Sequence, residues 1–151
     1  MMTSDKTGRF RRWVFWTGIY DIVAFGVLAC PFTLKMFLSV SNGLNEALGL
    51  GGTLAAFPVN VNNLLMINTL GVILIFLGIM LIVASLDIER RAWFVFWEGL
   101  IRIIFFILSF YVILFKGAAQ IVFVFGIIDL IIAVIYLYYI FTIEGLKIAR
   151  P

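Results

Sequence analysis

The stretch Trp97-Glu98-Gly99-Leu100-Ile101-Arg102 lies inside the long apolar segment Trp93–Phe115 and decides how the chain can fold. The segment approaches the ~20 residues that a bilayer-spanning helix needs, yet it carries an acid and a base within one helical turn. That spacing places Glu98 and Arg102 on one helical face, where they can pair. Because an ionised side chain in hydrocarbon costs roughly 3 kcal/mol, we expect this face to point toward other helices.

The composition of the whole chain indicates a membrane protein with a single domain, residues 1–151. Apolar residues make up 64% of the chain and charged residues 13%, against about 45–50% apolar residues in typical soluble domains. The pattern of apolar segments predicts an all-α integral membrane four-helix bundle. Its spans are expected at about 13–37, 64–86, 93–115 and 118–141, with one sizeable outer loop at 39–62.

Basic residues gather beside the expected spans on one side of the membrane. With four spans, only Lys35 and Lys116 fall on the other side. By the positive-inside rule we expect an up-down-up-down topology with the N and C termini in the cytoplasm. Because the basic residues are split among short segments at the membrane edge, they argue against nucleic acid as a partner. The residues on the cytoplasmic side are Lys6, Arg9, Arg11, Arg12, Arg90, Arg91, Lys147 and Arg150.

Histidine is absent, and Cys30 is the single cysteine. An internal disulfide and a cysteine metal cluster are therefore impossible. The lack of histidine also removes the usual ligand of haem, zinc and copper and the usual acid–base catalyst near neutral pH. The sequence thus provides no catalytic residue, no metal ligand and no cofactor, and it disfavours an enzyme.

The first span begins and ends irregularly. Met1–Phe10 is short and polar, and we expect a frayed tail there. Pro31 should kink the span or end its regular part. A charged start before an apolar run also fits a signal peptide. Asp21 interrupts that run, however, and Pro31 directly follows Cys30, which favours a retained span.

The outer loop contains one candidate helix. Leu44, Ala47 and Leu48 share a helical face and predict a short helix on the outer surface. Gly51-Gly52 should break it, and Pro58 introduces an irregular entry to the second span. The loop is either a plain connector or a lid or docking surface, and both readings stay open.

Each expected span carries one stripe of small and polar residues spaced by three and four positions. Small residues let helix backbones approach closely in lipid, where packing drives association. Four stripes that face one axis predict the four-helix bundle. The stripes are Gly18, Asp21, Phe25 and Leu28; Asn68, Gly71, Ile75, Gly78, Ile82 and Ser85; Val95, Glu98, Arg102, Phe105 and Ser109; and Ala119, Val122, Gly126, Asp129, Ala133 and Tyr136.

The charged residues on these stripes lie at overlapping depths. At a rise of ~1.5 Å per residue, Glu98 and Asp21 lie about 9 and 12 Å from the cytoplasmic boundary. Arg102 and Asp129 lie about 15 and 18 Å from it. We therefore predict that these four side chains form one buried polar cluster. Asn68 either joins this cluster or only satisfies polar groups of the second span. The cluster can simply fix helix pairing and register, or it can handle protons or bind a polar head group. Two carboxylates could also do acid–base catalysis, but no nucleophile, metal ligand or phosphate loop accompanies them.

The layout resembles the DoxX-like group of small bacterial membrane proteins. The resemblance is carried by Gly18 and Asp21 early in the first span, an outer loop rich in Gly and Pro, and a basic inner turn before the third span. It implies a four-helix bundle in a bacterial inner membrane. Some members of that group are associated with quinone-linked oxidation complexes, so the resemblance also implies a quinone-linked role, and we carry over no catalytic residue from it.

Three functions fit these observations. The leading hypothesis is a non-catalytic accessory or scaffold subunit of a larger membrane complex. Its partners would be the lipid bilayer and either other membrane subunits or further copies of the chain. Missing cofactor ligands and very apolar outer faces favour it. The alternative is a small carrier or proton-linked binding protein that uses the acid/arginine cluster, favoured by the excess of acid within the membrane. The third is a quinone-linked redox subunit.

Overall fold

The structure is a computed structural model that describes residues 2–143 and 146, with side chains from residue 5 onward. Within that part the fold is all-helical, apart from an isolated bridge between Thr53 and Ala118. Four helices are long and apolar enough to cross a membrane, which confirms the predicted all-α class with four helices of membrane-spanning length. The helices are α1 (Met2–Gly26), α2 (Pro31–Ala47), α3 (Val61–Leu86), α4 (Ile88–Lys116) and α5 (Ile121–Thr142).

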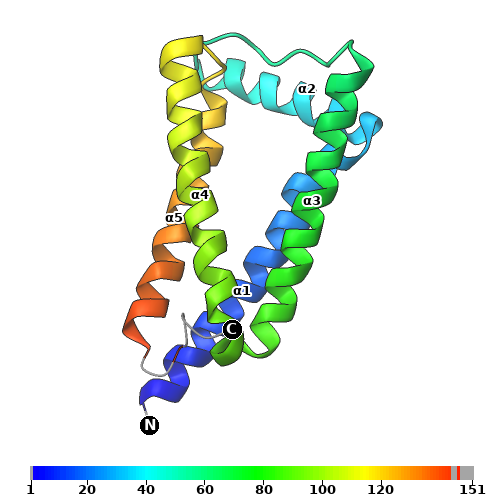
Figure 1. Cartoon of the computed structure of the whole chain (residues 1–151). Helices are drawn as coiled ribbons and strands as arrows, with labels where there is room; N and C mark the ends of the chain where they lie inside the picture. The colour runs from blue at the N-terminus through cyan, green and yellow to red at the C-terminus, as the bar shows by residue number, and fades with distance from the viewer. Residues whose placement is uncertain (1, 144–145, 147–151) are drawn as a thin grey trace.

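The four long helices are arranged as two pairs (Figure 1). Helix α1 lies along α3, and α4 lies along α5. The pairs meet near the turn between α3 and α4, which we call the narrow end. They diverge toward the opposite end, the wide end, where α2 crosses between them. Each pair therefore packs mainly against itself, and the contacts between pairs are concentrated away from the wide end.

Helices α1 and α3 approach closely because glycines face each other where they cross. A Cβ atom on Gly78 would lie 2.7 Å from the carbonyl oxygen of Gly18 and 3.2 Å from the Cβ of Asp21. A Cβ atom on Gly71 would lie 2.3 Å from the backbone nitrogen of Ala29. The small-residue stripe expected on the second span is thus the surface that receives α1. Gly78 also leaves the space in which Asp21 sits.

The seam between α4 and α5 is less tight. A Cβ atom on Gly126 would meet the Cβ of Ser109 at 3.4 Å, and one on Gly99 would meet Tyr136 at 3.7 Å. Helix α4 ends at Gly117, whose φ of 66° is the left-handed conformation that suits glycine at a helix C-terminus. This turn returns the chain into α5.

The start of the chain differs from the expected frayed tail. Except for Met1, which lies outside the described residues, the segment belongs to α1. Phe10 is fully buried there, and its ring stacks on that of Tyr139 in α5, with centroids 5.2 Å apart. Packing against α5 therefore extends the helix into a stretch that its polar composition alone does not favour.

The expected first span 13–37 is also interrupted. Helix α1 ends at Gly26, the 3-10 turn η1 (Val27–Ala29) follows, and Cys30 has an extended backbone. Pro31 then begins α2 as its first residue, where the missing N–H costs no helical hydrogen bond. The residue before a proline favours extended geometry, so Pro31 ends one helix and starts another.

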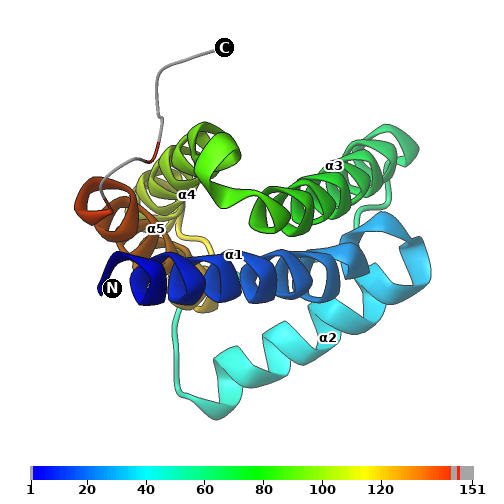
Figure 2. The same cartoon turned by 90° about the horizontal axis from the view of Figure 1, so that it is seen from below.

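Helix α2 and the loop after it connect the two pairs at the wide end (Figure 1), and the view from below shows α2 outside α1, on the side away from α3 and α4 (Figure 2). Buried Asn45 accepts a hydrogen bond from the backbone N–H of Ile121 at 3.0 Å, which ties α2 to the start of α5. The backbone N–H of Thr53 donates to the carbonyl of Gly117 at 2.7 Å. The loop is therefore docked on the α4–α5 turn. The outward face of α2 is apolar and suits the lipid–water boundary; it includes Phe32, Met36, Val40 and Leu44.

The glycine contact between α1 and α3 gives a stability prediction. Gly78→Val should destabilise the protein by about 1–3 kcal/mol or more, because the added atoms meet the α1 backbone. The measurement is the free energy of unfolding in micelles. Gly8→Val is the matched control, since a Cβ atom there has no neighbour within 4 Å. An equal loss of unfolding free energy in the two variants would show that α1 and α3 are not in close contact at Gly78.

Candidate functional site

One arginine holds three carboxylates from three helices. In Arg102, on α4, Nη2 donates to both carboxylate oxygens of Asp21 on α1, at 2.7 and 2.6 Å. Its Nη1 donates to Oδ1 of Asp129 on α5. Its Nε lies 2.6 Å from Oε1 of Glu98 one turn earlier. The Nε–H is not directed at that oxygen, so this contact is an ion pair without hydrogen-bond geometry.

Local packing positions each of these side chains. Asp21 follows Gly18 by one turn, and Gly18 presses α1 onto α3. Asp129 follows Gly126 by one turn, and Gly126 presses α5 onto α4. Residues three positions apart share a helical face, so Asp129 points toward α4 and meets Arg102 there. Asp21 borders Gly78 of α3 with its Cβ and reaches across to the same arginine with its carboxylate. The repeated glycine-to-acid spacing in the sequence thus sets the two carboxylates on either side of the guanidinium.

The cluster is deeply buried, and its charges do not balance. All four side chains belong to residues that are at most 5% exposed. Three ionised acids and one arginine would carry a net charge of −2 (three minus, one plus), which is costly in a medium with little water. Glu98 Oε2 is buried and has no hydrogen-bond partner among the described residues. The Nε of Arg102 also makes no hydrogen bond, although it is paired with Glu98 Oε1. The site therefore has a free acceptor, one donor held only in an ion pair, and an excess of negative charge.

A cavity of about 200 Å³ opens against the cluster. Asp21, Glu98, Arg102 and Asp129 form its charged part. Its remaining walls are apolar and come from α1, α3 and α4: Phe25, Leu70, Leu74, Leu77, Ile101 and Phe105. The arrangement thus combines a small charged floor with walls suited to a hydrocarbon group.

The fifth residue of the predicted cluster, Asn68, lies apart from the other four. It sits half-buried on α3 and neither bonds to a cluster residue nor lines the cavity. Its Oδ1 is buried without a partner in the described part of the chain. Tyr136 on α5 shares with Asn68 only an unsatisfied polar atom: its ring is fully buried against Phe10, and its hydroxyl lacks a hydrogen-bond partner in the described part of the chain.

The apolar walls are the part of the site that sequence reasoning misses. Leu70, Leu74 and Leu77 look like lipid-facing residues, since leucine serves equally well on a lipid surface and a cavity wall. One signal was available: Phe25 and Phe105 lie on the same stripes as Asp21 and Arg102. Aromatic residues beside charged ones on an inward face indicate a wall of mixed character.

No protein-family model, no curated protein and no solved structure matches the chain. The chemistry of the site is therefore argued from its geometry. The carboxylates face a guanidinium, and no group of three or more His, Cys, Asp or Glu side chains in the described residues could hold a metal ion. The arrangement can bind a polar group, and it can hold or release protons at its carboxylates.

Removal of the central cation tests what the cluster does for stability. Arg102→Met should cost about 3–5 kcal/mol of unfolding free energy in micelles, because three buried carboxylates lose their partner. Adding Asp21→Asn, Glu98→Gln and Asp129→Asn should recover most of that loss, since neutral groups need no counter-charge.

Arg90→Met is the control for that series. Arg90 is exposed and lies 3.7 Å from Asp87, so its loss should cost no more than about 1 kcal/mol. An Arg102→Met variant as stable as Arg90→Met would show that the cluster does not hold the helices together.

Proposed function

We propose that this membrane protein binds a small amphipathic molecule between its two helix pairs. The charged cluster receives the head group, and the apolar walls receive the tail. The observation that carries this proposal is the cavity of about 200 Å³ with Asp21, Glu98, Arg102 and Asp129 on one side and apolar side chains on the others. A cluster that only fixed the pairing and register of the helices would need no such cavity beside it.

The free groups of the cluster indicate which head groups fit. The nitrogens of Arg102 are all directed at or paired with carboxylates. Two buried cluster atoms lack a hydrogen-bond partner, Oε2 of Glu98 and Nε of Arg102, but that Nε already faces Oε1 of Glu98 at 2.6 Å. A hydrogen-bond donor therefore fits better than an acceptor, and a cation also offsets the negative excess. Amines and hydroxyl compounds fit this description.

The same reasoning bears on a quinone-linked role. The oxygens of a quinone accept hydrogen bonds and would compete with three carboxylates for Arg102. A hydroquinone donates through its hydroxyl groups and could reach Glu98. If the ligand belongs to this class, the geometry supports the reduced form as the one bound.

We further propose an up-down-up-down topology with the narrow end in the cytoplasm of a bacterial cell and the protein in the inner membrane. Exposed basic residues support this orientation, because Arg9, Arg11, Arg12, Arg90 and Arg91 are exposed on α1 and α4 toward the narrow end. Lys147 and Arg150 lie outside the described residues. At the wide end the basic residues are Lys35 and Lys116.

The leading sequence hypothesis, an accessory or scaffold subunit, stays a prediction, as does the likeness to the DoxX-like group. The exposed apolar side chains of α3 and α4 fit lipid and a partner helix equally well. The cavity, by contrast, favours the binding of a small ligand. Ligand binding is also compatible with a place in a larger complex, and the cavity makes it the stronger proposal.

Binding of a simple amphipathic amine tests the proposal. In a non-ionic detergent, dodecylammonium should raise the thermal unfolding midpoint of the purified protein, because a ligand that binds only the folded state stabilises it. Dodecyl sulfate, with the same tail and an anionic acceptor head, should not. Glu98→Gln should weaken binding of the amine about tenfold, which is ~1.4 kcal/mol.

Two variants make the result interpretable. Glu89→Gln alters an exposed acid on the same helix and should bind the amine normally. Ile101→Trp adds bulk to a half-exposed side chain that lines the cavity and should block binding without disturbing the core. Equal binding of the amine by the protein, Glu98→Gln and Ile101→Trp would refute the proposed site.

The orientation is tested with introduced cysteines in a Cys30→Ser background, which leaves no other thiol. A membrane-impermeant maleimide should label Gly43→Cys on α2 in intact cells. It should label Glu89→Cys, beside the α3–α4 turn, only after the membrane is permeabilised. Both positions are exposed. The reverse labelling pattern would place the narrow end outside.

A further inference from the structure

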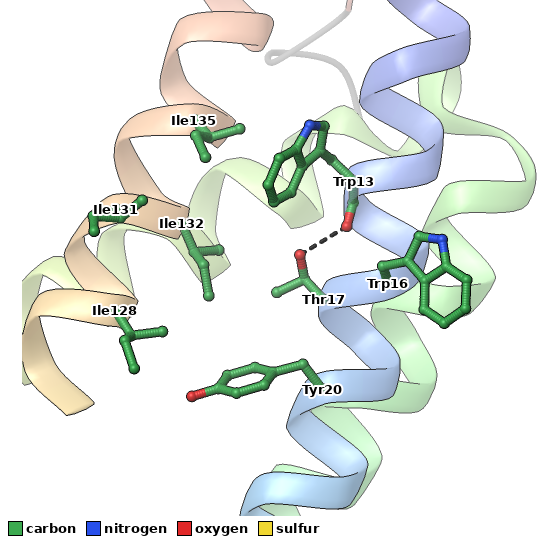
Figure 3. Close-up of a pocket in the computed structure, with 8 residues that line it drawn as sticks. All are labelled: Trp13, Trp16, Thr17, Tyr20, Ile128, Ile131, Ile132 and Ile135. Atoms are coloured by element: carbon green, nitrogen blue, oxygen red, sulfur yellow. Dashed lines mark hydrogen bonds between the residues drawn. The ribbon is translucent and has the colours of Figure 1, made fainter. Parts of the chain in front are cut away.

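A second hollow lies between α1 and α5, near the narrow end (Figure 3). This groove has a volume of about 310 Å³ and shares no lining residue with the cavity at the charged cluster. Its α1 side is formed by Trp13, Trp16, Thr17 and Tyr20. Its α5 side is formed by isoleucines, among them Ile128, Ile131 and Ile132.

The groove is short and apolar inside. Figure 3 shows the ring of Trp13 at one end, between the two helices, and the ring of Tyr20 extending toward Ile128 at the other. The hydroxyl of Thr17 donates to the carbonyl of Trp13 at 2.7 Å, so it is already satisfied. Trp13 and Tyr20 are separated by about 10 Å along the helix, at ~1.5 Å per residue. A hydrocarbon chain fits this length, whereas a transmembrane helix needs a groove along the whole span.

Basic side chains continue the same face of α1 beyond the groove. Lys6 and Arg9 precede Trp13 by seven and four residues, which places them on its face of the helix. Arg12 precedes Trp16 by four residues and lies beside them. Arg9 is paired with Asp5, and both are exposed. No carboxylate in the described part of the chain lies within 4 Å of Lys6 or Arg12, so these cations are available to an anion.

We propose that the α1–α5 groove is a binding site for an acidic phospholipid of the bilayer. One acyl chain lies along the isoleucines, and the phosphate is held by Lys6, Arg9 and Arg12. Charge complementarity selects an anionic head group, because basic residues at the cytoplasmic edge of a membrane attract anionic lipids. The rings of Trp13 and Tyr20 border a site at the depth that amphipathic aromatic side chains prefer. The proposal does not rest on ligand binding at the charged cluster.

Quenching of tryptophan fluorescence by brominated lipids tests the site. The variant Trp16→Phe/Trp93→Phe/Trp97→Phe keeps only Trp13, and the three replaced side chains are exposed. It is reconstituted in phosphatidylcholine nanodiscs that contain a minor fraction of brominated phosphatidylglycerol or, separately, of brominated phosphatidylcholine. Trp13 should be quenched several-fold more by the anionic lipid than by the zwitterionic lipid at the same fraction.

A matched control separates this site from the general lipid shell. A variant that keeps only Trp97, which is exposed on α4 and lies outside the groove, should be quenched equally by both lipids. Lys6→Gln/Arg9→Gln/Arg12→Gln in the Trp13-only variant should remove the preference for the anionic lipid. Nanodiscs have equivalent faces, so any change of orientation caused by the lost charges has no effect. Ile131→Phe, at an exposed lining position, should reduce quenching of Trp13 by both lipids.

Three results would overturn the proposal. Equal quenching of Trp13 by the two lipids would show that the groove does not select an acidic head group. The same anionic preference at Trp97 would assign it to the whole surface. Protection of Trp13 from both lipids, with Trp97 quenched, would show that protein covers the groove, either a partner helix or a second copy of the chain.

Discussion

The fold depends on one guanidinium that three carboxylates share. Each helix pair has its own seam, glycine against backbone in α1–α3 and small residues in α4–α5. Neither seam joins one pair to the other. Arg102 does so, because it bonds to Asp21 on the first pair and to Asp129 and Glu98 within the second. A buried apolar core near the narrow end, which includes Phe10, Leu81, Val95 and Tyr136, also joins the pairs. Arg102 adds the charged link farther along the helices, where the pairs begin to diverge.

Stability alone does not explain the composition of this cluster. A buried arginine with one or two acids would be a neutral or nearly neutral link, and apolar residues of similar volume are often at least as stabilising. The third acid adds negative charge and an unsatisfied oxygen where both are costly. Such a feature is typical of sites that accept something, a proton or a donor group, and the cavity lies where that group would enter. The divergence of the helix pairs is thus related to the cluster: close packing would leave no space beside Glu98.

The sequence determines the helices and the charged residues better than it determines their arrangement. Glu98 and Arg102 identify an inward face by their spacing, and the Gly71/Gly78 stripe identifies a close contact. The stripes do not say which helix packs on which, since small residues fit any partner. The break after Gly26 is hidden in a continuous apolar run, and only Pro31 marks it. The helical start of α1 depends on Phe10 meeting Tyr139, residues more than a hundred positions apart. The cavity walls are leucines and phenylalanines, which have the same identity whether they face lipid, ligand or protein.

The groove and the cluster are neighbours along the same two helices. Tyr20, at the inner end of the groove, precedes Asp21, and Ile128 precedes Asp129. A lipid chain seated between Trp13 and Tyr20 would therefore brace α1 against α5 one residue away from the two carboxylates that hold Arg102. Any change in the α1–α5 spacing changes the distance that one guanidinium must bridge. Coupling between two sites is reciprocal, so a ligand that loosens the hold of Asp21 or Asp129 on Arg102 would also weaken the groove. A lipid bound in this groove would therefore help to set the distance between the two carboxylates that hold Arg102.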